Sequence, residues 1–347
     1  MDLRLFKCQG RCLFRRRGKE RGSILVVILW ALFFLAALAV AIYAYVWPLV
    51  NFGRKLKNDT EMHYLAKAGV KRAIWEIKKD KINLYSTLKD TWSNNEDAFK
   101  ERKVGEDGFF SVRYKISDPS EDAEVRYGLV DEERKININT SSNLVLKDFF
   151  ERVGKLSSQD SADIAASIID WRDENDVPES GGAENDYYST LGYPCKNKAF
   201  EVLEELLFVK GITPEVFDKI KDKITIYGTG VVNINTAETL VLEALGLTES
   251  LAEKIIHFRK GDDGKEATDD DGIFEAVGTI EQTLTDKESL SREELSQLSN
   301  LIAEGLLSVR SDHFRGESFG ELTAEKSTKE IIFVFNRSGV VEYWKEN

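Results

Sequence analysis

The sequence predicts an α+β protein in which a long N-terminal helix packs on a small antiparallel sheet that is interrupted by a large inserted helical domain. Residues 23–50 are apolar and uncharged, and apolar side chains at steps of three and four continue the helix to about residue 79. Helical patterns also fill about 170 residues of the remaining chain. Stretches rich in β-branched and aromatic residues, as strands are, flank this helical part at 109–116, 124–130, 306–310, 331–335 and 340–344.

Capping signals support helices in the inserted part. Ser291 with Glu294 forms a capping box, and Thr213 stands before a first-turn proline at another helix start. We therefore divide the chain into a leader at 1–22, a membrane part of the long helix at 23–50, a helix-and-sheet domain at 51–135 and 306–347, and an inserted helical domain at 136–305.

The apolar stretch 23–50 is long enough to cross a membrane. At about 1.5 Å per residue it reaches roughly 42 Å, more than a hydrocarbon core of about 30 Å. Eight of the first 21 residues are Lys or Arg, whereas the far flank opens with only Arg54, Lys55 and Lys57. By the positive-inside rule the N-terminus stays in the cytoplasm, and the chain after about residue 50 is exported.

The junction between Gly22 and Ser23 predicts a processing site. A basic leader that ends in Gly directly before a long apolar helix resembles the type IV prepilins and pseudopilins, in which a membrane peptidase cuts after the Gly and methylates the new amine. A secretory signal peptide would have an apolar core of only about 7–15 residues, and a plain signal anchor is the remaining alternative. Most members of the family carry Glu as the fifth residue after the cut, where this chain has Val27. The K-type minor pseudopilins of type II secretion systems lack that Glu too.

Two segments of the insert resemble the K-type minor pseudopilins more closely. These are residues 168–188, with Asp170-Trp171 followed by Gly182-Ala183-Glu184, and residues 203–215, which end in Gly211-Ile212-Thr213-Pro214-Glu215. The resemblance implies a subunit at the tip of a periplasmic pseudopilus that acts in protein secretion. It also implies an inner-membrane anchor, processing by the prepilin peptidase, and I-type and J-type minor pseudopilins as partners.

An apolar stripe follows the membrane segment on the same helix. We interpret it as core, because such stripes usually pack against their own domain. If the chain is a K-type pseudopilin, we expect the partner pseudopilins to contact the same stripe. Its members are Met62, Leu65, Ala66, Gly69, Val70, Ala73 and Ile77.

The segment Asn-Ile-Asn-Thr occurs twice in the insert, within residues 136–140 and 232–236. Each copy precedes an apolar helix that its Thr could cap, and the pair resembles the helix-hairpin-helix units of competence DNA-uptake proteins. The chain has 60 acidic against 48 basic residues, a net charge of −12, and such a surface repels nucleic acid. We therefore favour a structural repeat and expect no nucleic acid. A membrane-tethered DNA-binding subunit of a competence or type IV pilus is the alternative.

An acidic loop in the insert predicts a calcium site. Asp173, Asn175 and Asp176 follow a predicted helix, and Glu184 and Asp186 return after a Gly-Gly turn. Calcium takes six to eight oxygen ligands from side chains, carbonyls and water. The resemblance supports calcium, because K-type pseudopilins hold it in their helical domain. The alternative is a solvated acidic loop.

Catalysis finds little support in the sequence. The three histidines lie on the long helix, a later helix and a strand, without a nearby nucleophile or a paired metal ligand. No Gly-rich phosphate loop follows a strand. We therefore expect no enzymatic activity, and a signal-anchored periplasmic enzyme is the third possibility.

Overall fold

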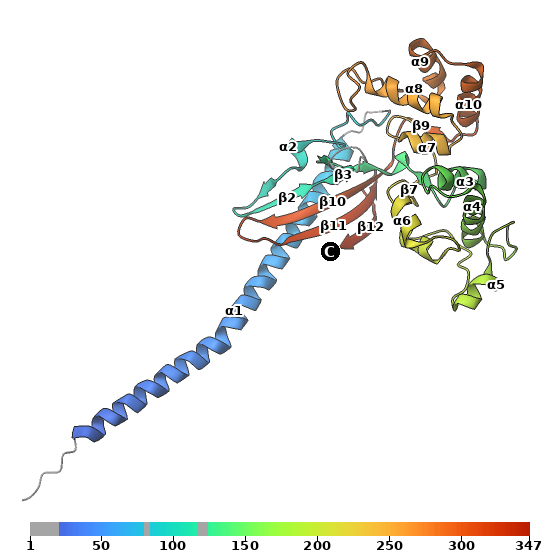
Figure 1. Cartoon of the computed structure of the whole chain (residues 1–347). Helices are drawn as coiled ribbons and strands as arrows, with labels where there is room; N and C mark the ends of the chain where they lie inside the picture. The colour runs from blue at the N-terminus through green and yellow to red at the C-terminus, as the bar shows by residue number, and fades with distance from the viewer. Residues whose placement is uncertain (1–20, 80–83, 117–123) are drawn as a thin grey trace, which may run out of the picture. The chain divides into compact units, whose positions relative to one another are not determined.

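The computed structural model describes residues 21–79, 84–116 and 124–347 (Figure 1). The predicted leader lies outside these ranges, apart from its last two residues. The chain divides into two compact units, of which the first ends at Asp59 and the second begins at Thr60. Helix α1 (Arg21–Lys79) begins in the first unit and ends in the second, where the sequence predicts its end. It is long and apolar enough to cross a membrane, and its large apolar side chains from Ile24 to Leu56 are exposed.

A six-stranded antiparallel sheet lies in the second unit, in the order β1-β2-β10-β11-β12 with β5 also paired to β10. This confirms the predicted combination of a long helix with a small antiparallel sheet. The sheet joins segments far apart in sequence, since Val112 of β2 pairs with Ser318 of β10. Its strands are β1 (Arg102–Val104), β2 (Gly108–Val112), β5 (Val130–Asp131), β10 (His313–Leu322), β11 (Thr328–Asn336) and β12 (Val341–Glu346).

Two predicted strands are broken in the structure. The stretch 109–116 divides at Arg113, whose backbone N–H donates to the Glu317 carbonyl (3.0 Å), and the stretch 124–130 divides likewise. The released halves, β3 (Tyr114–Ile116) and β4 (Glu124–Arg126), form a separate antiparallel pair. The predicted strand at 306–310 is present as β9 (Leu307–Ser308), but it pairs with β8 (Val232–Asn233) and not with the sheet.

Helix α1 and strand β10 approach each other unusually closely. The positions of β10 that face the helix are buried and mostly small, namely Phe314, Gly316, Ser318 and Gly320. A Cβ on Gly320 would lie 1.9 Å from the Met62 carbonyl oxygen, and the Ser318 hydroxyl donates to the Ala66 carbonyl (2.8 Å). Side chains from both elements share one hydrophobic core with Trp92 and Phe99. The small residues are therefore what allows the helix to lie directly on the strand.

The insert contains most of the remaining helices, and Figure 1 shows them gathered beside short strands. Thr213 and Ser291 cap α6 and α10, as their sequence signals predict, and the capping box with Glu294 is formed. Ser157 caps α4. The helices of the second unit after α1 are α2 (Glu96–Phe99), α3 (Asn143–Arg152), α4 (Ser158–Arg172), α5 (Asn185–Tyr188), α6 (Pro214–Ile220), α7 (Thr239–Ala244), α8 (Glu249–Lys260), α9 (Ile280–Lys287) and α10 (Arg292–Ala303), with 3₁₀ turns η1 (Glu132–Arg134), η2 (Ser189–Leu191), η3 (Leu203–Phe208) and η4 (Val277–Thr279).

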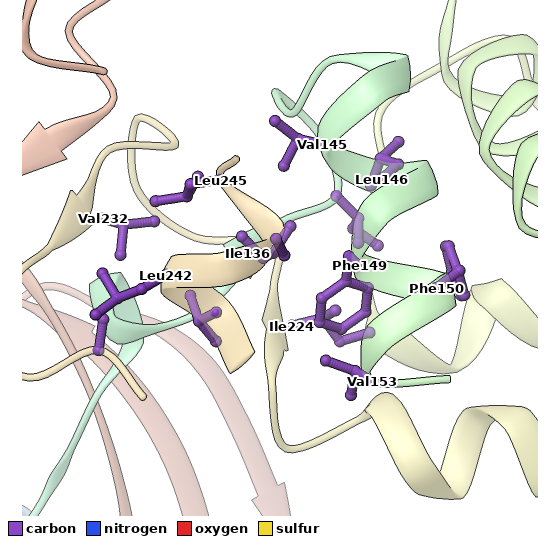
Figure 2. Close-up of a cluster of buried hydrophobic side chains, with 14 of the residues drawn as sticks. Ile136, Val145, Leu146, Phe149, Phe150, Val153, Ile224, Val232, Leu242 and Leu245 are labelled. Atoms are coloured by element: carbon purple, nitrogen blue, oxygen red, sulfur yellow. The ribbon is translucent and has the colours of Figure 1, made fainter. Parts of the chain in front are cut away.

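The insert is built twice on one plan. In the first copy β6 (Ile136–Asn137) pairs in parallel with β7 (Ile224–Thr225), and in the second β8 pairs in parallel with β9. Each copy places a helix pair between its two strands, α3 with α4 and α7 with α8. Figure 2 shows the apolar cluster that both copies share, with Phe149 of α3 beside Ile224 and Leu242 of α7 near Val232.

The repeated Asn-Ile-Asn-Thr segments make equivalent hydrogen bonds. Asn139 exchanges two hydrogen bonds with the backbone of Phe200 (2.8 and 3.1 Å), and Asn235 does the same with Phe274 (both 2.9 Å). The first Asn of each segment accepts from the backbone N–H two residues on. The repeat is therefore structural, and a helix-hairpin-helix character is not confirmed. The predicted Thr caps are wrong: Ser142 caps α3, and the residue before α7, Glu238, makes no capping bond.

A buried carboxylate joins the insert to the sheet. Asp131 ends β5, and its Oδ2 accepts hydrogen bonds from Ser311 Oγ (2.5 Å), Thr236 Oγ1 (2.6 Å) and Asn233 Nδ2 (3.3 Å). Burial raises the pKa of Asp131 to about 7, which shows how costly this position is for a charge. Thr236 thus holds the second repeat to the sheet.

Replacing Gly320 by Ala tests the close approach of α1 and β10. The added methyl group cannot fit against Met62 and Ala66, so we expect the free energy of unfolding to fall by about 1–3 kcal/mol, the usual cost of overpacking. Chemical denaturation of the full chain in detergent measures it. Gly278→Ala is the matched control, because a Cβ there meets nothing within 4 Å. Equal stability of Gly320→Ala and the unsubstituted chain would contradict the packing described.

Candidate functional site

Asp170 anchors the acidic loop after α4, although the sequence analysis did not identify it as a functional residue. Asp170 is fully buried in the last turn of α4, and its two oxygens accept from the backbone N–H groups of Glu179 (2.9 Å) and Ala183 (2.7 Å). Because these bonds span the loop, Asp170 fixes the path of the chain from Arg172 to Glu184. The sequence signal that could have identified Asp170 is its position among the apolar residues 168–171, where a carboxylate is expected only if it has hydrogen-bond partners.

The structure brings three of the five predicted calcium ligands to one pocket. Asp176, Glu184 and Asp186 line a pocket of about 360 Å³ together with the Gly182-Ala183 turn. Asn175 does not line it, and its Oδ1 instead accepts from the Val177 backbone N–H (2.7 Å).

Asp173 stands apart from the pocket lining as well. Its Oδ1 accepts from the Asn175 backbone N–H (3.1 Å), while its charge still acts on the Glu184 carboxyl. Nowhere in the described ranges do three His, Cys, Asp or Glu side chains converge closely enough to hold a metal ion by themselves. A cation here would therefore also need backbone carbonyl or water oxygens, which calcium accepts.

Glu184 is the residue of this pocket that most needs a partner. Its side chain is 4% exposed, and neither carboxylate oxygen has a nitrogen or oxygen donor in the structure, although the weakly donating thiol of Cys195 interacts with it. Burial raises the pKa of the Glu184 carboxyl, and the charges of Asp170 and Asp173 raise it further. A buried carboxylate without a donor costs free energy unless a cation neutralises it. The pocket therefore fits a cation with oxygen preference.

The predicted partner stripe on α1 lies inside the protein's own core. Met62, Leu65, Ala66, Val70, Ala73 and Ile77 are 0–7% exposed, and Gly69 is buried against Ser318. This confirms the interpretation of the stripe as core. It also means that these seven positions offer no free surface to a partner, because the protein's own core already covers them.

The opposite side of α1 is exposed and aromatic. Tyr64 is 65% and Trp75 49% exposed, and the Arg72 guanidinium lies 4.4 Å from the Trp75 ring centroid. Lys67 lies 5.8 Å from the rings of both Tyr64 and Trp344. Sequence reasoning missed this face, because Tyr64 and Trp75 stand among lysines on the polar side of the stripe. Exposed large aromatic side chains with adjacent cations are common at protein interfaces.

The predicted processing site lies at the start of α1. Gly22 and Ser23 are both helical, and Ser23 is exposed. The leader before Arg21 lies outside the described residues. Cleavage at this bond therefore stays a prediction.

Comparison with known proteins agrees with this architecture. Residues 128–229 match a family model described as type II secretion system (T2SS), protein K. A chain of the crystal structure of the GspK-GspI-GspJ complex from the enterotoxigenic Escherichia coli type 2 secretion system is similar in fold, with a TM-score of 0.59. The match covers 87% of this chain and 99% of that chain at 17% sequence identity. No curated protein matches this chain. The matched family model, whose range includes the acidic loop, and the shared fold together support a K-type minor pseudopilin of type II secretion.

Proposed function

We propose that this chain is the K-type subunit at the tip of a type II secretion pseudopilus, where it initiates assembly with I-type and J-type minor pseudopilins. The family-model match over residues 128–229 carries this proposal, because it falls on the insert that interrupts the pilin-like sheet. The prepilin peptidase cuts between Gly22 and Ser23. Helix α1 then anchors the protein in the inner membrane, with its N-terminus cytoplasmic and its second unit periplasmic.

Two features favour a position at the tip over one within the fibre. Val27 is an apolar residue in the membrane part of α1, so it cannot form the buried ion pair with a neighbouring amine that a Glu would form. The insert of about 170 residues would also be difficult to accommodate inside a tight helical stack of subunits. Both features are acceptable in a subunit that has no neighbour above it.

A structural role agrees with the chemistry of the described residues better than catalysis or DNA binding does. The comparisons point to a secretion-system component, and they give no support to the helix-hairpin-helix DNA-binding alternative. The repeated Asn side chains donate to the backbone carbonyls of Phe200 and Phe274, so they serve the fold of the insert.

The partner pseudopilins pack on the exposed aromatic face of α1. Tyr64 and Trp75 are about three turns apart on the helix, so both can contact one partner helix along its length. Lys67, Lys71 and Arg72 lie beside them and suit an acidic partner surface. This replaces the buried stripe as the expected contact.

The double variant Tyr64→Ala with Trp75→Ala tests this contact. Each large aromatic side chain contributes about 1.5–3 kcal/mol on burial, so we expect the affinity for the coexpressed I-type and J-type subunits to fall at least about tenfold. Size-exclusion chromatography of the ternary complex measures the loss. Leu84→Ala is the control, since Leu84 is 76% exposed and lies outside α1. An intact ternary complex with the double variant would contradict the proposed face, and no complex with the unsubstituted chain would contradict the pseudopilin assignment.

We also propose that the pocket around Glu184 binds calcium. The carboxylates of Glu184, Asp176 and Asp186 would hold the ion, with backbone and water oxygens completing its shell. The bound ion would neutralise the buried Glu184 charge and tie the loop after α4 to the start of α5. Its role in this proposal is to order the loop.

The variant Glu184→Gln separates calcium binding from folding. A ligand at 100 times its dissociation constant stabilises by about 2.7 kcal/mol, so calcium should raise the Tm of the unsubstituted chain by several degrees over chelator. Glu184→Gln should lose this shift, yet be at least as stable in chelator, because it removes a buried charge. Glu179→Gln, an exposed carboxylate of the same loop, should keep the shift. Identical melting curves with calcium and with chelator would refute the site.

A further inference from the structure

The His313 ring lies between two carboxylates where the insert meets the sheet. His313 begins β10, and its Nδ1 lies 2.8 Å from Oε1 of Glu133, which belongs to the turn η1 that leads into the insert. Its Nε2 lies 3.5 Å from Oε2 of Glu342 on β12. The side chain of His313 is 17% exposed and that of Glu133 is 5% exposed. A protonated ring therefore ties η1 to two strands of the sheet.

The other charged groups near the His313 ring do not offset these carboxylates. Asp312, its neighbour in sequence, adds a third negative charge and lies 3.7 Å from the Arg337 guanidinium. Arg315, two residues further along the same face of β10, has its own carboxylate partner in Glu317 (3.3 Å). The surroundings of the ring thus favour a positive charge on it.

The insert covers the His313–Glu133 pair with backbone. A Cβ on Gly228 would lie 2.9 Å from Glu133 Oε1 and 3.5 Å from His313 Nδ1, so the chain of the insert runs directly against the pair. Tyr227 stays neutral in the pH range considered, because burial raises the pKa of its hydroxyl. Separation of the insert from the sheet would therefore expose the pair to water and remove the environment that favours its proton.

Asp131 is a second site for a proton at the same contact. Its Oδ2 accepts hydrogen bonds from the Ser311 and Thr236 hydroxyls, and each of these hydroxyls can also accept one. The Thr236 hydroxyl has an alternative acceptor 3.4 Å away, the Asn233 carbonyl. The hydrogen bonds can therefore reverse when Asp131 gains a proton, without a change in the path of the chain.

The charges that face Asp131 act in opposite directions. Glu133 opposes its ionisation, and Arg134 favours it. The Arg134 guanidinium is itself held by Glu238 of the insert (2.9 Å). We call this contact the joint, formed by Asp131, Glu132 and Glu133 with His313 and the insert residues that bind them.

Both proton sites change the stability of the joint in the same direction. The hydrogen bond to Glu133 raises the pKa of the His313 ring above 6.5, so its contribution is present below pH 6.5 and is lost as the pH rises through the raised value. Burial, and then the charge of Glu133, raise the pKa of Asp131 from 3.8 to about 7, so its contribution is lost between about pH 4 and pH 7. The joint therefore holds protons near pH 6 that it has lost at pH 8.

We propose that the joint is a pH-dependent latch, in which protons on His313 and Asp131 hold the insert against the sheet and their loss above neutral pH lets the two parts separate more often. The latch acts through η1, which contacts β10, β12 and the insert at once. The insert is consequently held more firmly in mildly acidic than in alkaline surroundings. The proposal does not depend on the pseudopilin assignment.

Hydrogen–deuterium exchange of the full chain in non-ionic detergent, measured by mass spectrometry, tests the latch. Amides of residues 130–138 and 232–237 report opening of the joint, once the pH dependence of the intrinsic exchange rate is corrected for. We expect opening to become about tenfold more frequent from pH 6 to pH 8, since each proton lost changes the equilibrium by up to about tenfold per pH unit. Amides 62–70 of α1, which pack on the far end of β10, should keep their protection. Unchanged protection of the joint would overturn the latch.

The variant His313→Asn assigns the effect to the ring. Asparagine keeps an N–H donor for Glu133 but does not titrate, so the pH effect at the joint should shrink about threefold or more. His257→Asn is the matched control, because His257 of α8 forms the same kind of pair with Glu288 (2.7 Å) but its side chain is 77% exposed. This control should keep the full pH effect.

A second variant keeps the test decisive if His313→Asn does not fold. Glu342→Gln removes one carboxylate from the His313 ring but keeps the acceptor for Asn336 Nδ2 (2.9 Å), and it should also reduce the pH effect. A full pH effect in the folded variants of this pair would overturn the latch at His313. An equal reduction in His257→Asn would overturn it as well.

Discussion

The attachment of the insert to the sheet depends on three successive buried carboxylates, Asp131, Glu132 and Glu133. Asp131 binds Thr236 of the second repeat and Ser311 before β10. Glu132 binds Lys135 and, through the Thr225 hydroxyl (2.5 Å), strand β7 of the first repeat. Glu133 accepts from the backbone N–H of His313 (2.9 Å) and contacts its ring. Burying charge is costly, so these carboxylates are stable only while all three parts are in place. The joint therefore makes the sheet and both repeats of the insert mutually dependent.

A second constraint acts where α1 lies on the sheet. Helix α1 can lie against β10 only because Gly320 leaves room for the backbone of Met62 and Ala66, and Gly69 leaves room for the Ser318 side chain. In the part of α1 after Thr60 this arrangement buries the apolar side of the helix and leaves the opposite face, with Tyr64 and Trp75, exposed. The outward side chains Arg315, Glu317 and Phe319 of β10 line a pocket of about 780 Å³. The strand thus packs on the core with one face and lines this pocket with the other.

The features that sequence predicts well are those set by local chemistry. The caps at Thr213 and Ser291 and the turn made by the first Asn of each repeated segment follow from side chains that act on nearby backbone. Strand β10 was not predicted, because its buried positions Gly316, Ser318 and Gly320 lack the β-branched and aromatic side chains typical of strands. Gly320 is small because the backbone of α1 lies against it. The spacing of the acidic residues in the sequence also does not reveal that the Asn175 side chain accepts a hydrogen bond from the Val177 backbone, whereas the Glu184 carboxylate has no nitrogen or oxygen donor. Those differences arise from tertiary contacts that no local pattern encodes.

The central claim is that this chain is a processed pilin-like subunit, whose helix α1 can be drawn from the membrane into a fibre by partner subunits. The N-terminal sequence and intact mass of the membrane-extracted protein test it most directly. The account predicts a chain that begins at Ser23 with a methylated amine. A chain that begins at Met1, or at any residue beyond the apolar stretch 23–50, would contradict it and leave an ordinary tethered domain.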